Sequence, residues 1–486
     1  MTTHRALGVQ TWLSAILGLA TLLPAIASAR PNIVLAIADD WGWPHASAYG
    51  DTGVETPSFD RLAREGVLLE HAYISSPSCT PSRGAIITGQ QFFRLGPAGN
   101  LWSVWPSGLP EYPRLLTGEG YFVGSYRKGW GPGIHPGTTV TPAGRRYASV
   151  EEFFEARPDG TPFCLWFGAS DPHRPYEPGS GRESGIAPED VHLFEHYPDV
   201  KTVRSDVADY YFEVQRFDRD VGDLLELLET MGELDNTLVV MTGDHGMPFP
   251  RGKGNLYDSG ARVPMAIMWK ASIPGGRVLT DFVSTTDLAP TFLTAAGLRV
   301  PGVMTGRSLL PILTSADAGR VSSERDHVIF GRERHVIAQE APDLGGYPSR
   351  GIRTDEFLYI RNYEPERWPA GTPDHERAQV PNAWLADCDN GPTKWFLWQN
   401  RDNPRFRRFY DLAFAKRPAE ELYDLSKDPG QVVNVAGEPE YLQTRKELAV
   451  RLAEALIELG DPRIQGRGSM FDVQPYLGGS PRFPTE

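Results

Sequence analysis

One short stretch of the chain combines residue types that could bind and transform an anion. It runs Ser78-Cys79-Thr80-Pro81-Ser82-Arg83-Gly84, so that a cysteine, a proline and an arginine alternate with small polar residues. The residues before it favour a β-strand, and those after it favour a helix with Pro81 in its first turn. Cys79 is therefore expected at a helix N-terminus, where free amide donors and the helix dipole favour an anion, with Arg83 close enough to share it.

Two other interpretations apply to this stretch. Cys79 can be a small buried residue, as free cysteines often are, with Arg83 a surface charge. A tyrosine phosphatase would need a longer loop between its cysteine and its arginine, so the spacing does not fit that class.

Acidic residues follow two apolar runs. Asp39 and Asp40 end the run 31–38, and Asp244 and His245 end the run 236–243. Continuous apolar runs are typical of buried parallel strands, and ligands of such sheets gather beyond the carboxyl ends of the strands. Adjacent carboxylates repel each other unless a cation lies between them, so Asp39 and Asp40 indicate either a cation site or a solvated turn.

The Cys79 stretch resembles the signature of the formylglycine-dependent sulfatases. In that family a separate formylglycine-generating enzyme oxidises the cysteine of Cys-x-Pro-x-Arg to an aldehyde. Similar landmarks run from Asn32 to about Asn434, which is nearly all of the chain after its N-terminal segment. The setting of Arg174 in Asp171-Pro172-His173-Arg174-Pro175 and the run Pro248-Phe249-Pro250 resemble the heparan N-sulfatase branch.

The resemblance implies a role for each matched residue. The implied metal ligands are Asp39, Asp40, Asp244 and His245, which suit calcium before magnesium because carboxylate oxygens favour a hard cation. The implied catalytic residues are Cys79 as formylglycine, Arg83, Lys128 and Lys253 around the sulfate, and His173 as the acid. One hydroxyl of the aldehyde hydrate would attack sulfur and the other would expel sulfate, while His173 protonates the leaving group.

Some positions depart from the family or match it only loosely. Trp130 stands where a histidine often follows the lysine, and His135 is a nearby candidate to replace that histidine. Polar residues predicted to reach the pocket rim and bind substrate are Arg174, Arg334, His335 and Arg350. The aromatic and arginine-rich stretch 395–410 suits either sugar stacking or ordinary packing.

Composition bounds the class of protein. The chain has 486 residues, a net charge of -14 and a pI near 5.4, which gives no sign of nucleic-acid binding. We expect an α/β catalytic domain over 30–325, with a large mostly parallel sheet flanked by helices. A smaller α+β domain with an antiparallel sheet is expected over 326–486. Long helices are predicted over 207–230 and 441–459 from their apolar stripes.

The N-terminus resembles an export signal. Residues 1–29 combine a charged start, an apolar core and Ala27-Ser28-Ala29, which predicts cleavage after Ala29 and a secreted or periplasmic protein. An uncleaved anchor is the alternative, and no later stretch is long and apolar enough to span a membrane. Cys164 and Cys388 could pair if Cys79 is modified, although Cys164 lies in an apolar run that favours a core position.

The leading functional hypothesis is an exported sulfatase acting on a sulfated sugar, with a heparan-type glucosamine sulfate favoured. A phosphate or phosphonate monoester hydrolase of the same superfamily is the first alternative. A catalytically silent sulfosugar-binding protein is the second, and only the departure at Trp130 suggests it.

Overall fold

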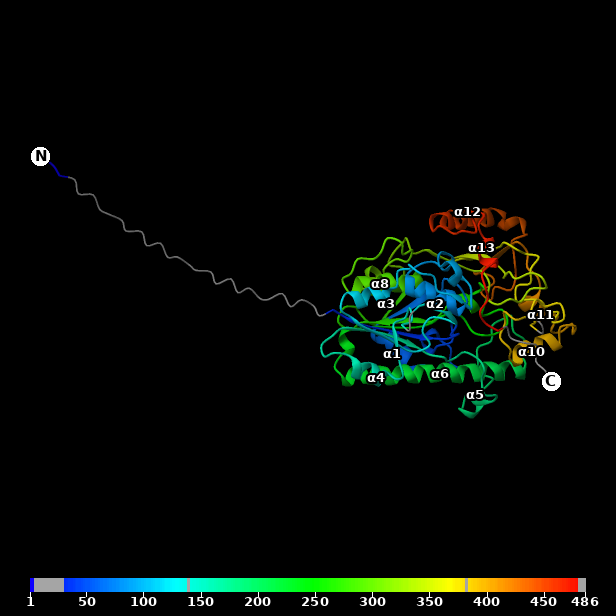
Figure 1. Cartoon of the computed structure of the whole chain (residues 1–486), viewed down its shortest axis with the longest axis horizontal. Helices are drawn as coiled ribbons and strands as arrows, with labels where there is room; N and C mark the ends of the chain where they lie inside the picture. The colour runs from blue at the N-terminus through cyan, green and yellow to red at the C-terminus, as the bar shows by residue number, and fades with distance from the viewer. Residues whose placement is uncertain (4–29, 138–139, 381–382, 480–486) are drawn as a thin grey trace.

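The computed structural model describes residues 1–3, 30–137, 140–380 and 383–479. Residues 4–29, on which the predicted signal peptide falls, lie outside the described residues. The described chain forms a large mixed sheet covered by helices on both faces and a smaller antiparallel sheet nearer the C-terminus (Figure 1). This is the predicted fold class.

The large sheet has the strand order β10-β2-β9-β8-β1-β7-β4-β6. Its strands are β1 (Asn32–Ala38), β2 (Val67–Tyr73), β4 (Phe122–Arg127), β6 (Arg145–Tyr147), β7 (Phe163–Gly168), β8 (Thr237–Gly243), β9 (Met265–Met268) and β10 (Arg277–Ser284). Only β9 runs antiparallel to its neighbours. β1 pairs in parallel with β7 on one side and with β8 on the other, so these three strands end at one edge.

Alternation along β1 shows how the sheet feeds two apolar cores. Ile33, Leu35 and Ile37 belong to one buried cluster, whereas Val34 and Ala36 belong to the other. Successive side chains of a strand point to opposite faces, so a continuous apolar run is needed when helices cover both.

Helices form the two outer layers, as Figure 1 shows. On one side are α1 (Pro57–Glu65), α4 (Val150–Ala156) and α6 (Lys201–Thr230); on the other are α2 (Cys79–Thr88), α3 (Tyr112–Gly118) and α8 (Leu288–Ala295). The prediction that the long helix begins at Val207 is wrong. It begins six residues earlier, at Lys201, and these six residues are mostly polar and so lack the apolar stripe.

The smaller sheet comprises β11 (His327–Arg332), β12 (Ser349–Thr354), β13 (Phe357–Asn362) and β14 (Glu420–Asp424), all antiparallel. Leucines of α12 (Leu442–Glu458) pack against this sheet in a separate apolar cluster. The remaining elements are short: β3 (Ser103–Val104), β5 (Gly133–Ile134), α5 (Ser180–Glu183), α7 (Asp258–Ala261), α9 (Leu310–Leu313), α10 (Pro392–Gln399), α11 (Arg407–Phe414) and α13 (Ser469–Asp472).

Two open questions from the sequence are answered by packing. The stretch 395–410 contributes to α10 and α11, where Trp395 stacks on Trp398 with ring centroids 5.2 Å apart, and both rings are partly buried against an apolar cluster. Cys164 and Cys388 are both buried and free, so they do not pair. Across the described residues, no helix has the length and hydropathy needed to cross a membrane.

Candidate active site

The ends of the central strands bring the predicted residues together. Asp39 follows β1, Asp244 follows β8 and Lys128 follows β4, while Cys79 is the first residue of α2. Parallel pairing of β1 with β8 places Ala38 beside Gly243, so the acidic residues after them are neighbours. The carboxyl edge of the sheet therefore carries the site, as expected for this class of fold.

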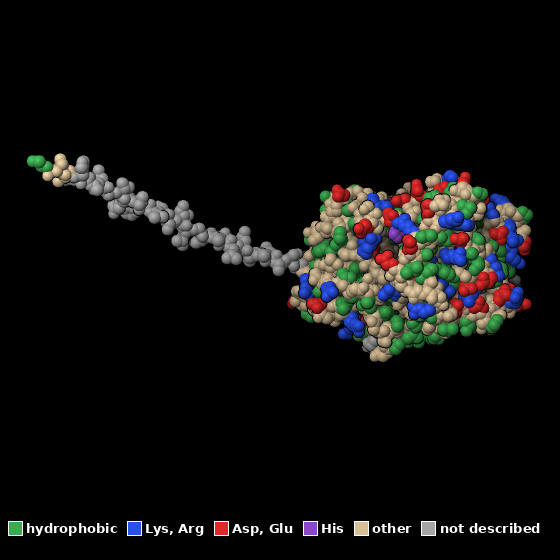
Figure 2. Space-filling view, turned by 90° about the horizontal axis from the view of Figure 1, so that it is seen from above, with side chains coloured by type: hydrophobic (Ala, Val, Ile, Leu, Met, Phe, Trp, Pro, Cys, Tyr) green, Lys and Arg blue, Asp and Glu red, His purple; other side chains and the backbone are tan. Residues whose placement is uncertain are grey.

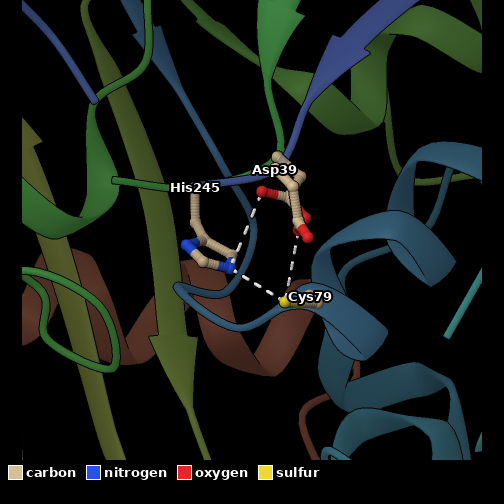
Figure 3. A group of neighbouring side chains, drawn as sticks. Asp39, Cys79 and His245 are labelled. Carbon is tan, nitrogen blue, oxygen red and sulfur yellow. Dashed lines mark hydrogen bonds and ion pairs between the residues drawn. The ribbon is translucent and has the colours of Figure 1, made fainter. Parts of the chain in front are cut away.

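Cys79 points into the acidic cluster. Its Sγ lies 3.2 Å from Nε2 of His245 and 3.6 Å from Oδ1 of Asp39, and Figure 3 shows the three side chains converging from separate segments. The extended backbone of Ser78 precedes the helix and lets its carbonyl accept the Ser82 amide. Burial raises the pKa of the Cys79 thiol, so it stays protonated at neutral pH.

The strand-end residues leave ligand atoms facing one another. The Asp40 amide donates to Oδ1 of Asp244 at 2.9 Å, and Asp40 adopts the left-handed region with φ at 73°. Nδ1 of His245 hydrogen-bonds the Gly246 carbonyl, so in the neutral ring Nε2 carries the lone pair. That Nε2 lies 3.1 Å from Oδ1 of Asp40, a buried oxygen without a hydrogen-bond donor.

These atoms fit a metal ion. Ligand atoms of Asp39, Cys79, Asp244 and His245 all lie within 4.8 Å of one another in buried positions. An unsatisfied buried carboxylate oxygen beside an imidazole lone pair is costly unless a cation lies between them. The donor set of carboxylates and one imidazole can therefore hold a divalent cation.

Three basic side chains surround the carboxylates. Nε of Arg83 donates to Asp244 at 2.7 Å, and Nζ of Lys128 contacts both oxygens of Asp39 at 2.5 Å. Nζ of Lys253 donates to Asp40 at 2.9 Å. Burial opposes ionisation of Asp39, but Lys128 and the other nearby cations outweigh it and hold its pKa well below the usual value.

His173 lies within reach of this centre. Its Nδ1 hydrogen-bonds the Arg174 carbonyl at 2.5 Å, which leaves Nε2 facing Asp40 at 3.9 Å from Oδ2. The side chain is 35% exposed and lines the cavity. An imidazole fixed through one nitrogen and accessible through the other can transfer a proton to a bound substrate.

A cavity of about 740 Å³ opens above the cluster. Its lining includes Asp39, Cys79, Lys128, Trp130, His173, Arg174, Lys253, His335 and Asp389. On the face shown in Figure 2, acidic and basic side chains surround a hollow with a histidine at its edge. Charges of both signs therefore meet at one opening rather than forming a uniformly basic groove.

The four predicted rim residues divide into two pairs. His335 lines the cavity, and its Nδ1 is 2.8 Å from the Ser78 hydroxyl. Arg174 also lines it, but its guanidinium forms two 2.8 Å bonds with Asp206. Arg174 therefore has few donors left for a ligand.

Arg334 and Arg350 do not reach the cavity, which corrects the prediction for both. Arg334 donates to backbone carbonyls, and Arg350 is fully buried between Glu333 and Asp461. Their sequence context showed polar groups but not that neighbouring segments would satisfy them.

Trp130 forms part of the cavity wall and packs edge-on against Trp105 at 4.9 Å. His135 lines a different cavity, of about 760 Å³. His135 therefore does not line the cavity that holds Cys79.

Asp389 is a cavity residue that sequence reasoning missed. Its Oδ2 accepts from Nζ of Lys253 at 3.0 Å. It lies in the chain between β13 and α10, in a loop with no periodic pattern or strand end. Nothing in the sequence marks such a residue as part of the site.

A protein-family model described as sulfatase matches residues 31–133 and 145–298, more than half of the chain. The chain belongs to the sulfatase family, whose members are sulfuric ester hydrolases. A second model, for the C-terminal part of N-sulphoglucosamine sulphohydrolase, matches residues 243–369.

Three similar proteins show how this sulfatase relates to others. Human N-sulphoglucosamine sulphohydrolase is 29% identical, covering 91% of this chain and 93% of its own. A structure solved with its substrate D-glucosamine-2-N,6-O-disulfate has a TM-score of 0.62 at 20% identity, covering 89% of this chain and 98% of that one. The phosphonate monoester hydrolase of Agrobacterium radiobacter has a TM-score of 0.61 at 18% identity, covering 89% and 95%.

Proposed function

We propose that this sulfatase removes a sulfate group from a carbohydrate, with a glucosamine sulfate as the favoured substrate, using formylglycine made from Cys79 and a bound calcium ion. The observation that carries the proposal is the position of Cys79 in the cavity, with Sγ against His245 and Asp39 of the acidic cluster. Relatives named for sulfated glucosamine support the choice of sugar.

The charge of the site suits a divalent cation and an anionic substrate. Four carboxylates face three basic side chains, which leaves one negative charge when the histidines are neutral; the carboxylates are Asp39, Asp40, Asp244 and Asp389. A divalent cation turns this into one positive charge, which complements a monoanionic sulfate group. Calcium is favoured over magnesium because three carboxylates supply hard, flexible oxygen ligands.

The thiol itself is a poor nucleophile here because burial raises its pKa. We therefore assign the nucleophile to formylglycine, whose hydrate supplies one hydroxyl to attack sulfur and a second to release sulfate. A separate maturing enzyme must oxidise Cys79, so that enzyme is the implied protein partner. The bound cation would neutralise charge on the sulfuryl oxygens.

The basic residues bind and orient the sulfate. The Lys253 ammonium has three donors, of which Asp40 and Asp389 occupy two, so one stays available for a sulfate oxygen. Lys128 is positioned in the same way by Asp39. His173, held through Nδ1, can protonate the leaving oxygen or nitrogen from Nε2 when its ring is in the imidazolium form.

A phosphate or phosphonate monoester hydrolase is the second candidate. The likeness to the Agrobacterium phosphonate hydrolase shows that this fold also supports that activity in another protein. Relative turnover of an aryl sulfate and an aryl phosphonate separates the two. Faster phosphonate turnover would reverse our choice.

The decisive experiment expresses the protein with a formylglycine-generating enzyme and follows two readouts. Mass spectrometry of the Cys79 peptide is expected to show an aldehyde, and the purified protein is expected to release sulfate from glucosamine sulfates. Cys79→Ala should abolish turnover, by about 10³-fold or more, because the nucleophile is lost. Cys164→Ala, a core cysteine in β7, is the matched control and should keep turnover.

An unmodified thiol in a protein that still releases sulfate would contradict the formylglycine assignment. A fully modified protein without sulfate release would instead favour the silent saccharide-binding alternative, for which Trp130 gave the only sign.

Export is a separate part of the proposal. The signal-like N-terminus supports cleavage after Ala29 and a secreted or periplasmic location. N-terminal sequencing of the protein recovered from its own cell is expected to begin at Arg30. An intact Met1 on the active protein would contradict it.

A further inference from the structure

Asp389 brings a negative charge beside the proposed proton donor. One of its carboxylate oxygens, one of Asp40 and a ring nitrogen of His173 lie within 4.8 Å of one another. Its side chain is 19% exposed and lines the cavity. Burial disfavours its charged form, but Lys253 and His173 outweigh burial and hold the Asp389 pKa below its usual value.

This carboxylate needs an explanation because the cavity is suited to an anion. A like charge beside a sulfate is repulsive. Lys253 does not require Asp389 for neutralisation, since it already pairs with Asp40 at 2.9 Å. A second metal ion does not account for it either, because the Lys253 ammonium already lies between the carboxylates of Asp40 and Asp389.

The two kinds of sulfate group differ at the atom that joins sulfur to the sugar. The nitrogen of a sulfamate carries a hydrogen, whereas the bridging oxygen of a sulfate ester has only lone pairs. A carboxylate near that atom accepts a hydrogen bond from the first and repels the second, and hydrogen bonds to charged acceptors are the stronger kind.

We propose that Asp389 accepts a hydrogen bond from the nitrogen of a sulfamate and makes this site prefer N-sulfated over O-sulfated glucosamine. The inference rests on the proposed function of the cavity as a glucosamine sulfatase site. Asp389 would contact the substrate directly, so it is a specificity residue and not only a partner of Lys253.

Asp389 assists the transfer of the sulfuryl group from the sulfamate nitrogen to the enzyme. The S–N bond breaks, its electron pair stays on nitrogen, and the sulfuryl group passes to the hydroxyl oxygen of the nucleophile derived from Cys79, whose proton is released to solvent in the cavity. Nitrogen receives a proton from Nε2 of His173 in its imidazolium form and leaves as the amine, and the ring becomes neutral. Asp389 accepts an N–H of the substrate before the step and of the amine, or its ammonium, after it.

The test compares Asp389→Asn with wild type, both matured, on glucosamine N-sulfate, glucosamine 6-O-sulfate and nitrophenyl sulfate. The amide keeps the shape but loses the charge and half of the accepting capacity. We expect kcat/KM for the N-sulfate to fall by at least about tenfold more than for either ester. Asp402→Asn, with an 81% exposed side chain, is the matched control and should change none of the three.

Each other outcome decides against the inference. Equal losses on all three substrates mean that Asp389 acts through Lys253 alone. Equal losses on both saccharides, with the aryl ester spared, mean that it accepts a sugar hydroxyl instead.

The proposed function can fail separately, which would show as no sulfate release from any substrate by wild type. Calorimetric binding then still tests Asp389. Glucosamine, but not N-acetylglucosamine, should bind Asp389→Asn more weakly than wild type because only the former carries an ammonium. Equal glucosamine affinity for the two proteins overturns the inference.

Discussion

Two fully buried arginines, Arg83 beside the cavity and Arg350 in the C-terminal part, have nearly the same local chemistry but different surroundings. Each Nε donates to an aspartate at 2.7 Å, and each guanidinium reaches a second carboxylate. Both also donate to backbone carbonyls. A buried arginine between two acids therefore does not by itself distinguish a catalytic site from a structural ion cluster.

The difference lies in what the carboxylates do with their remaining oxygens. Around Arg350, the carboxylates have further donors. The side chain of Arg463 donates to Glu333, and the backbone amide of Arg463 donates to Asp461. Around Arg83, the acidic cluster leaves Oδ1 of Asp40 without a donor. A buried polar atom without a hydrogen-bond partner therefore indicates a ligand-binding site, whereas the ion pairs alone do not.

The largest effects are expected when each arginine is replaced by methionine. Arg350→Met should lower the free energy of unfolding by about 3–5 kcal/mol, because it leaves buried carboxylates without their partner. Arg83→Met should cause a similar loss in chelator but a smaller one with calcium, since a cation can pair with Asp39 and Asp244. Urea unfolding with and without calcium measures the stability of both variants. If calcium stabilises Arg83→Met and Arg350→Met equally, the proposed difference between the two arginine clusters is wrong.

Calcium added to the metal-free wild type should give the next largest effect. A ligand that binds only the folded state stabilises it by about 4 kcal/mol at a thousand times its Kd. Asp40→Asn should lose this stabilisation by calcium, because it removes the charge of the carboxylate whose Oδ1 has no hydrogen-bond donor. Asp461→Asn should be destabilised yet keep the response, which makes it the matched control. Calcium-independent melting of the wild type would refute a calcium site, and a larger response to magnesium would reverse the choice of metal.

The same contrast explains how much of the molecule could be predicted from its sequence. The apolar runs identify β1 and β8 as buried strands, and the carboxyl ends of parallel strands lie at one edge of a sheet, so Asp39 and Asp244 could be placed together. Cys79 and Arg83 were found because one helical turn joins them. All of these positions depend on short-range order.

The C-terminal contribution to the cavity could not be predicted in this way. Arg350 and Asp389 both lie in polar stretches, but only the packing of distant segments decides that the first is enclosed by Asp461 and the second faces Lys253. Similarly, the start of α6 was missed because its first residues contact the rest of the protein through polar side chains such as Asp206, which pairs with Arg174. Tertiary contacts, not periodicity, determine these roles.

Lys394 is a third buried cation, and the change in stability expected from replacing it is the smallest of the three. Its buried ammonium donates to the Cys388 carbonyl and to Asn390, in the loop that carries Asp389. Within the described part of the chain, no carboxylate forms an ion pair with it. Burial lowers the pKa of Lys394 to about 8 from its ordinary value of 10.5.

The sign of the resulting pH dependence follows from proton counting. Between pH 8 and 10.5 the unfolded chain binds more protons at Lys394 than the folded protein does, so stability rises with pH there and the full penalty applies below pH 8. Relative to Lys394→Met, wild type should therefore gain up to about 3 kcal/mol from pH 7 to pH 10.5. Lys446→Met, at an exposed lysine of α12, should show no such trend in urea unfolding. If the difference in unfolding free energy between wild type and Lys394→Met does not change with pH, the charge of Lys394 is stabilised by its neighbours as fully as that of Arg350 is by its carboxylates.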